Sequence, residues 1–404
     1  MSKKALIFLS FVSAYFLSYF FRTANAVISK DLALDFQLDA AQLGLMTSIF
    51  FLTFAAAQLP FGAILDHFGA RFSTPILMLS ASLGCLLFAK AQSFWHLSLG
   101  RGLIGLGMAG ILMGAYKAFE GWFENREFAT TIGMMVGLGS MGGIISGGPL
   151  LWLSQHYGWR SVFAVGTVIV IIAALFIMLV AERKDRKQHR IQGIGLWQGF
   201  QRIFSEVSFW RIALLNCALV GSMLSYQSLW MAPYLGQALE FQDGTLGTLM
   251  SILGIGAVVG YFISGWLCDR FGMLSVITLS SFAFCLFQLV FALMPSQSPM
   301  LLMSLAIFGF GMLGVSAIQL LSLVRSYFPS ELSGRAVTGV NLFGFLGIFS
   351  LQWFLGLFIR QFPSTTALNL YEAKAYRFSF LLTGLLCLAA LAFFLPEWWR
   401  SRKA

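Results

Sequence analysis

A short polar phrase that occurs twice constrains this chain more than any other feature. Residues 62–71 carry one pattern and residues 265–272 repeat it 203 positions later; the shared residues are Gly62, Asp66 and Gly69 in the first copy and Gly265, Asp269 and Gly272 in the second. Each copy lies between two long apolar stretches. A polar loop repeated between apolar stretches indicates two copies of one helical bundle. Transporters built from paired repeats bind their substrates where the repeats meet.

The composition is that of a membrane protein. Charged residues make up 10% of the 404 residues and hydrophobic residues 58%, whereas soluble domains carry about 25% charged residues. A run of about 20 apolar residues can cross a bilayer, and twelve such runs occur, near residues 5–32, 42–65, 74–90, 97–119, 129–153, 161–181, 211–236, 246–267, 274–294, 300–327, 333–360 and 378–395. We therefore expect an all-α integral membrane protein with twelve transmembrane helices in two six-helix bundles related by pseudo-two-fold symmetry.

The expected organisation is an N-terminal bundle over residues 1–182, a cytoplasmic linker over 183–208 and a C-terminal bundle over 209–404. The linker begins with a charge run, 182–190, and continues into 191–206, where Ile194, Trp197, Phe200 and Phe204 recur at helical spacing. This spacing favours an amphipathic helix lying on the inner leaflet. A partner-binding segment is the alternative interpretation.

The net charge of +10 follows from topology rather than from nucleic-acid binding. Lys and Arg gather near the two ends of the chain and in the cluster 183–190, which is the positive-inside bias of membrane proteins. We therefore expect a multi-pass protein of the bacterial inner membrane, monomeric, with both termini cytoplasmic and no nucleic-acid partner. The five cysteines are scattered, and no metal-ligand cluster, phosphate-cradling loop or paired nucleophile and base occurs, so we expect no metal, no cofactor and no enzymatic activity.

These motifs resemble the major facilitator superfamily over the full chain. Residues 62–71 resemble its loop signature G-x-x-x-D-x-x-G-x-R, and Arg101 and Gly105 resemble its fourth-span motif. The resemblance implies alternating access, with Asp66 facing the start of span eleven near Ser333 and Asp269 facing the start of span five. The expected gating and structural residues are Gly62, Asp66, Gly69, Arg71, Arg101, Gly105, Arg126, Gly265, Asp269, Arg270, Gly272 and Arg335. The alternative is that the two loops are only tight turns.

Arg22 is the strongest candidate for a substrate contact. It lies seventeen residues after Ala5, about 25 Å along a helix axis, which places a costly guanidinium deep in the bilayer. Tyr15, Tyr19 and Asn25 follow the same helical stripe, and the stripe carries no carboxylate at mid-depth. A guanidinium without a counterion, beside aromatic hydroxyls, is suited to bind a carboxylate or phosphate. Snorkelling or capping of a neighbouring helix is the alternative.

Tyr19-x-x-Arg22 is similar to the first span of organophosphate and organic-anion members of the superfamily. The seventh-span arginine of the organophosphate exchangers has no counterpart here, because Tyr226, Gln227 and Trp230 occupy that region. A small monoanion or zwitterion is therefore the expected substrate. Gln319 in span ten and Asn341 in span eleven are further candidates, each as either a substrate contact or an interhelical hydrogen bond.

The coupling mode follows from the placement of the acids. All 16 Asp and Glu residues fall in loops or near span ends, so the sequence favours exchange or facilitated diffusion over proton coupling. Three alternatives remain open: a proton symporter of the same substrates, a drug or metabolite efflux antiporter, suggested by Gly148-Pro149, and a non-transporting sensor of the same fold.

Overall fold

A computed structural model describes residues 2–120, 122–123, 125–181, 196–296, 298–365 and 370–403. The charge run of the linker lies outside the described residues, as do the side chains of Asp66 and Arg126. Eleven helices are long and apolar enough to cross a membrane, or twelve if one bent pair is counted as a single span. The expected all-α fold with two related bundles is confirmed.

The first six spans are formed by ten helices. Their bounds are α1 (Lys3–Thr23) and α2 (Asn25–Phe36), α3 (Ala40–Phe68), α4 (Ala70–Ala89), α5 (Phe94–Met108) and α6 (Ile111–Glu120), α7 (Asn125–Ser140), α8 (Gly142–Ile145) and α9 (Gly148–Tyr157), and α10 (Trp159–Val180). The first, fourth and fifth spans are thus interrupted, which the apolar runs alone do not reveal.

The second six spans repeat this order after α11 (Leu196–Phe204). Their bounds are α12 (Val207–Ser225), the π-helical turns η1 (Tyr226–Trp230) and η2 (Tyr234–Ala238) flanking α13 (Met231–Pro233), α14 (Asp243–Phe271), α15 (Met273–Leu293), α16 (Met300–Gly314), η3 (Val315–Ile318), α17 (Gln319–Tyr327), α18 (Ser330–Ile359) and α19 (Ala373–Lys403). The only strands in the described residues are β1 (Ser364–Thr365) and β2 (Leu370–Tyr371), which pair antiparallel.

The two bundles use the same helix contacts. In the first, α1 packs on α7, α4 on α10 and α3 on α5; in the second, α12 packs on α18, α15 on α19 and α14 on α16. These are corresponding spans in each half. The bundles meet along two seams, α3 against α18 and the broken fifth span against α14. In transporters built from two such repeats, the substrate site lies where the repeats meet.

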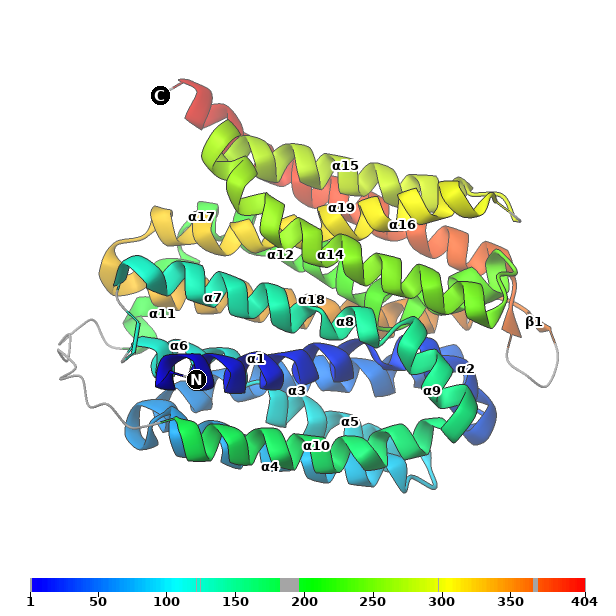
Figure 1. The fold of residues 1–404 in the computed structure, drawn as a ribbon. Coiled ribbons are helices and arrows are strands. Elements are labelled where there is room, and N and C mark those ends of the chain that lie inside the picture. The colour runs from blue at the N-terminus through cyan, green and yellow to red at the C-terminus, as the bar shows by residue number, and fades with distance from the viewer. Residues whose placement is uncertain are drawn as a thin grey trace.

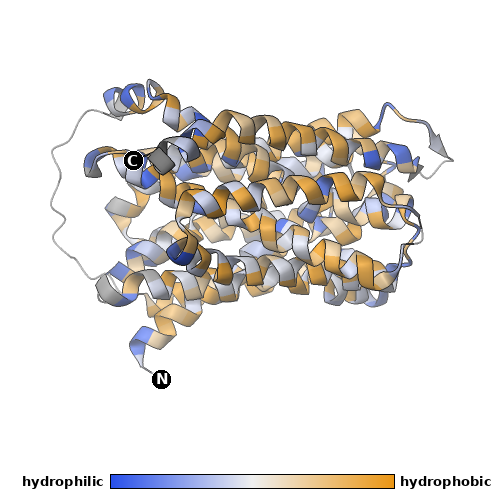
Figure 2. Ribbon diagram, turned by 90° about the horizontal axis from the view of Figure 1, so that it is seen from above, coloured by the Kyte–Doolittle hydropathy of each residue, from blue (hydrophilic) through white to orange (hydrophobic). Residues whose placement is uncertain are grey.

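The molecule has two polar ends and an apolar middle (Figure 2). Both chain termini lie at one end, and β1 lies at the other (Figure 1). We call these ends the termini side and the hairpin side. α11 lies on the termini side and packs on α18 and α12, with Ile203 fully buried. The helix expected over 191–206 is therefore shorter in the described residues and packs partly on protein.

The repeated phrase owes its glycines to backbone geometry. Gly69 ends α3 and Gly272 ends α14, with φ of 73° and 83°. Only glycine adopts this region without strain. Each glycine lets a long span stop and the next begin one residue later.

Glu397 is a buried acid that ties three spans of the second bundle together. It is 3% exposed and accepts hydrogen bonds from Arg211 at 2.6 Å and from Ser208 and Tyr327 at 3.0 Å. Replacing Glu397 with alanine should lower the free energy of unfolding by about 3 kcal/mol, because Arg211 would lose its counterion in a poorly solvated site. Thermal unfolding of the purified protein measures this effect. An unchanged midpoint would contradict the structural role, and Glu397→Gln should have the smaller effect because it still accepts hydrogen bonds.

Candidate functional site

A cavity of about 170 Å³ lies between the bundles and contains Arg22. Its walls come from spans one, two and four of the first bundle and from spans seven, eight, ten and eleven of the second. The lining residues are Tyr15, Tyr19, Arg22, Phe54, Gln58, Met108, Ala109, Leu112, Met113, Asn216, Val220, Met223, Leu224, Tyr261, Gly314, Val315, Ile318, Leu321, Asn341, Gly344 and Phe345. Both repeats therefore contribute to one cavity.

Arg22 occupies the last turn of α1, just before the span is interrupted at Ala24. The carbonyl end of a helix carries partial negative charge, which favours a cation there. Arg22 as a residue is 4% exposed. The end of α1 thus lowers the free-energy cost of burying the Arg22 charge, but it does not supply a full negative charge.

The contacts of Arg22 are with rings rather than with acids. Its guanidinium carbon lies 4.5 Å from the ring centre of Tyr19, 5.2 Å from that of Phe54 and 5.8 Å from that of Phe345. Its Nε is buried without a hydrogen-bond partner, and no ion pair among the described residues includes it. The guanidinium therefore lies among aromatic rings and makes no hydrogen bond or ion pair in the described part of the chain.

Two side chains hold the interrupted end of α1. Arg101 of α5 is fully buried, and its Nη1 donates to the carbonyl of Phe21 at 2.7 Å. Thr23 donates to the carbonyl of Tyr19 at 2.9 Å and shares a hydrogen bond with Ser146. Carbonyls at a helix end need such partners. Arg101 therefore binds the carbonyl of the residue that precedes Arg22 and fixes the helical turn that carries Arg22.

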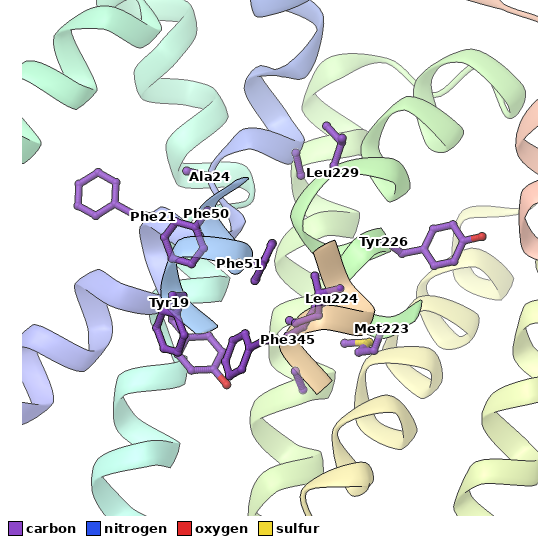
Figure 3. Close-up of a cluster of buried hydrophobic side chains, with 14 of the residues drawn as sticks. Tyr19, Phe21, Ala24, Phe50, Phe51, Met223, Leu224, Tyr226, Leu229 and Phe345 are labelled. Atoms are coloured by element: carbon purple, nitrogen blue, oxygen red, sulfur yellow. The ribbon is translucent and has the colours of Figure 1, made fainter. Parts of the chain in front are cut away.

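Four polar side chains bridge the bundles at the cavity wall. The hydroxyls of Tyr19 and Tyr261 are 2.7 Å apart, and Asn341 donates to Gln58 at 3.0 Å. Phe54 and Phe345 stack at 4.5 Å between the same two spans as the amide pair. Figure 3 shows Tyr19 and Phe345 close together, with Met223 and Leu224 beside them. The structure thus brings Tyr15, Tyr19, Arg22 and Asn341 of the expected site into one cavity.

The other expected substrate contacts lie outside the cavity lining. Asn25 donates to Thr47 of α3, Gln319 to Ser264 of α14, and Trp230 to the carbonyl of Gln352. Tyr226 bonds Thr383 and stacks on Phe380 at 3.9 Å, and it points away from Tyr19 in Figure 3. Gln227 is buried near Gly143 of the other bundle. Their polar groups serve contacts between helices in this structure.

In the second-copy loop, the side chains of Asp269 and Arg270 bond no described residue of the first bundle. Asp269 and Arg270 are exposed, and Asp269 has no hydrogen bond or ion pair with a described residue. In the first copy, Arg71 donates to the carbonyl of Met178 within its own bundle. Arg335 lies against Gly199 of α11. Gly105 has a packing role, because a Cβ there would meet the carbonyl of Phe50.

Close contacts join the bundles on the hairpin side. A Cβ at Gly44 would meet the carbonyl of Gln352 at 2.8 Å, one at Gly147 would meet the amide of Ser251 at 2.6 Å, and one at Gly356 would meet the carbonyl of Ala40. Four polar contacts cross the same end: Arg360 with Asp39, Lys30 with Asp243, Gln155 with Asp243, and the amide of Ala40 with the hydroxyl of Tyr371.

A vestibule of about 580 Å³ lies outside this closed layer, lined in part by Lys30, Asp31 and Asp243. It shares no described lining residue with the central cavity. On the termini side, a Cβ at Gly62, Gly133, Gly265 or Gly334 would meet nothing within 4 Å. The hairpin side is therefore closed by contacts between described residues of the two bundles, whereas these four glycines leave room for a side chain.

Tyr261, Gln58, Phe54 and Phe345 are cavity residues that the sequence reasoning missed. Tyr261 and Gln58 carry a usable signal, because each is a polar side chain within an apolar span. The two phenylalanines carry none, since the chain has 42 of them. Among the described residues, no group of three or more His, Cys, Asp or Glu could hold a metal ion.

Comparison with known proteins places the chain in a broad family. A family model described as Major Facilitator Superfamily matches residues 11–352 and 233–403. A nitrate/nitrite transporter of Picosynechococcus sp. is 35% identical over 133 residues, covering 33% of this chain and 25% of that protein. A D-galactonate transporter of Escherichia coli O6:H1 is 25% identical over 389 residues, covering 88% of this chain and 89% of that protein.

The first curated relatives are matched only in part, over 25% to 63% of their own length. Among solved structures, a bacterial homolog of the human lysosomal transporter Spinster, in an inward-facing and unoccupied conformation, superposes with a TM-score of 0.76. It is 18% identical, and the match covers 98% of this chain and 96% of that chain. This likeness supports the fold.

Proposed function

Because the chain belongs to the major facilitator superfamily, whose members are transporters rather than enzymes, we propose that it is a secondary transporter of a small organic anion or zwitterion. Transport proceeds by alternating access around Arg22. The observation that carries this proposal is the position of Arg22: the guanidinium lies in a cavity between the bundles, and its edge has no partner among the described residues. A carboxylate or phosphate oxygen is the natural acceptor for that edge.

The relatives support an anionic cargo. The D-galactonate relative covers most of both chains and is named for a sugar acid, and the nitrate/nitrite relative is named for two inorganic anions. Both names denote transport of anions, which supports an anionic substrate for this chain. The lining of the cavity supports the same charge class, since Arg22 is its one cationic side chain among the described residues.

The membrane is the bacterial inner membrane, with both termini on the cytoplasmic side and the protein acting as a monomer. Lys and Arg near the ends of the chain support this orientation through the positive-inside bias. The termini side is then cytoplasmic, and the closed hairpin side faces the periplasm. The central cavity in this conformation belongs to an inward-facing state. In the opposite state the cavity faces outward, and the loop around Asp269 closes against the first bundle.

Exchange or facilitated diffusion is the proposed mode of transport. The ionisable side chains that line the cavity in the described residues are Arg22 and three tyrosines, Tyr15, Tyr19 and Tyr261. The buried acid Glu397 is engaged by Arg211 in the second bundle. A bound anion neutralises Arg22, so loaded carrier can reorient without a proton.

Counterflow in proteoliposomes tests the proposal. Liposomes carrying the purified protein are preloaded with unlabelled 4-hydroxybenzoate or D-gluconate, and uptake of the labelled anion is followed with and without a pH gradient. Accumulation driven by the internal anion supports the proposal. Uptake that requires an inward proton gradient would favour the proton symporter instead. Binding of the anion without flux would favour the non-transporting sensor. Transport of bulky cationic drugs would favour the efflux antiporter.

Arg101 should act on transport by positioning Arg22. Arg101→Met is expected to lower anion affinity about tenfold, because the loss of one charge-assisted hydrogen bond at the end of α1, about 1.4 kcal/mol, frees the turn that carries Arg22. Methionine fills the same space and removes two buried nitrogens without partners, so the unfolding temperature should change little. Titration calorimetry and thermal unfolding measure the two effects. Wild-type affinity in this variant would limit Arg101 to packing.

A further inference from the structure

The walls of the central cavity combine an apolar surface with polar groups at Arg22, the amide pair, three tyrosines and Asn216. Three methionines, Met108, Met113 and Met223, and six branched aliphatic side chains from both bundles form the apolar part of the wall, together with Phe54 and Phe345. Methionine side chains adapt to irregular apolar surfaces. The polar groups on the wall largely satisfy one another: Tyr19 with Tyr261, Gln58 with Asn341, and Asn216 with the carbonyl of Val340.

The charge pattern of the lining restricts the charge of the ligand. Arg22 can neutralise one negative charge, and no second cation lines the cavity in the described part of the chain. A dianion would keep one charge buried without a partner, which is costly. A zwitterion would bring an ammonium group into a cavity whose described lining holds no carboxylate. A single compact anionic group fits this arrangement.

The size and polarity of the walls restrict the body of the ligand. A cavity of about 150 Å³ lined by Leu, Ile and Phe is known to accept benzene, and this cavity measures about 170 Å³. A sugar acid of similar size carries several hydroxyls, each needing a hydrogen-bond partner once buried. The free valences of Gln58 and Asn341 and the spare hydroxyl hydrogen of the Tyr19–Tyr261 pair can serve a few such groups, and the methionine and leucine side chains serve none.

We infer that the ligand of this cavity is a monoanion with an apolar body about the size of one six-membered ring, bound with its carboxylate at Arg22 and its ring against Met113, Met223 and Leu224. This inference rests on the proposed transport of an organic anion around Arg22. It narrows that substrate class to aromatic or alicyclic monocarboxylates and separates it from sugar acids, dicarboxylates and amino acids.

A matched ligand panel tests this inference on the intact purified protein. Titration calorimetry at pH 7.5 compares benzoate and cyclohexanecarboxylate with D-gluconate, terephthalate and 4-(aminomethyl)benzoate, the last three adding hydroxyls, a second carboxylate and an ammonium group. Benzoate and cyclohexanecarboxylate are expected to bind at least tenfold more tightly than the other three, and Arg22→Ala should abolish that binding. Equal or tighter Arg22-dependent binding of gluconate, terephthalate or the zwitterion overturns this inference and leaves the proposed function standing. Absence of Arg22-dependent binding of every anion overturns both.

A wall variant provides a second test. Met223→Gln places an amide in the apolar wall at nearly constant volume and should weaken benzoate binding five- to tenfold while narrowing its advantage over gluconate. The matched control is Met141→Gln, because Met141 is 43% exposed and lies outside the cavity lining. It should bind both ligands as the wild type does. If the folded Met223→Gln protein kept the wild-type ratio of benzoate to gluconate affinity, the inferred contact between this wall and an apolar ligand body would be wrong.

Discussion

Replacing Arg22 with alanine is expected to lower anion affinity at least a hundredfold and to reduce counterflow to the background of empty liposomes. Arg22 as a residue is 4% exposed, and the described lining offers no other cation to the anion. Removing one member of a buried, hydrogen-bonded charge pair costs about 3 kcal/mol, which corresponds to a factor of about a hundred. Titration calorimetry and counterflow on the same preparation measure both effects.

Arg22→Lys separates charge from geometry. Lysine keeps the positive charge but lacks the planar fork that can bind both oxygens of a carboxylate and stack between Tyr19 and Phe345. It should recover only a small part of the affinity. The control is Arg202→Ala, which removes one positive charge from the exposed face of α11 and should leave transport unchanged. Full transport by Arg22→Ala would refute the anion-receptor role.

Replacing Gly356 with valine is expected to reduce counterflow at least fiftyfold while the protein still folds. A side chain at this position would meet the backbone carbonyl of Ala40 across the α3–α18 seam. Backbone in a packed seam cannot move aside as a flexible side chain can. The hairpin side should then fail to close, and a carrier held open on one side cannot complete a cycle.

Gly334→Val is the matched control, because Gly334 lies on the same helix and a Cβ there would meet nothing within 4 Å. It should transport at close to the wild-type rate. The state of the carrier can be read from Ala232→Cys, a buried position on the vestibule wall, with a membrane-impermeant maleimide. Labelling should rise in Gly356→Val and stay low in Gly334→Val. Wild-type counterflow in Gly356→Val would show that the seam tolerates separation.

The sequence predicted the architecture because membrane spans follow directly from apolar length. The repeated loop located the internal symmetry, and the confirmed family and fold agree with it. The interruptions at Ala24 and along η1–η2 were not predicted, because helix breaks inside apolar runs depend on contacts such as Arg101 with the carbonyl of Phe21.

The candidate site was harder to predict for a different reason. Helical spacing puts Arg22 and Asn25 on one stripe, and both meet α3, but Asn25 faces Thr47 there and Arg22 faces Phe54. A single helix does not reveal which of its polar groups a neighbour will satisfy. Tyr226 and Trp230 illustrate the same limit in the second bundle. Tyr261 stands out as a polar residue in an apolar span, but its partner Tyr19 is found only when span eight is placed against span one.

The contact between Tyr19 and Tyr261 leaves one hydroxyl hydrogen without an acceptor in the pair. Two phenols carry two hydroxyl hydrogens, and their mutual bond at 2.7 Å uses one of them. The spare hydrogen belongs to a pair with one member in each half of the carrier. An oxygen acceptor that takes this hydrogen bonds one phenol directly and is linked to the other phenol through their mutual hydrogen bond. One oxygen atom of the bound substrate can therefore connect the two halves of the carrier.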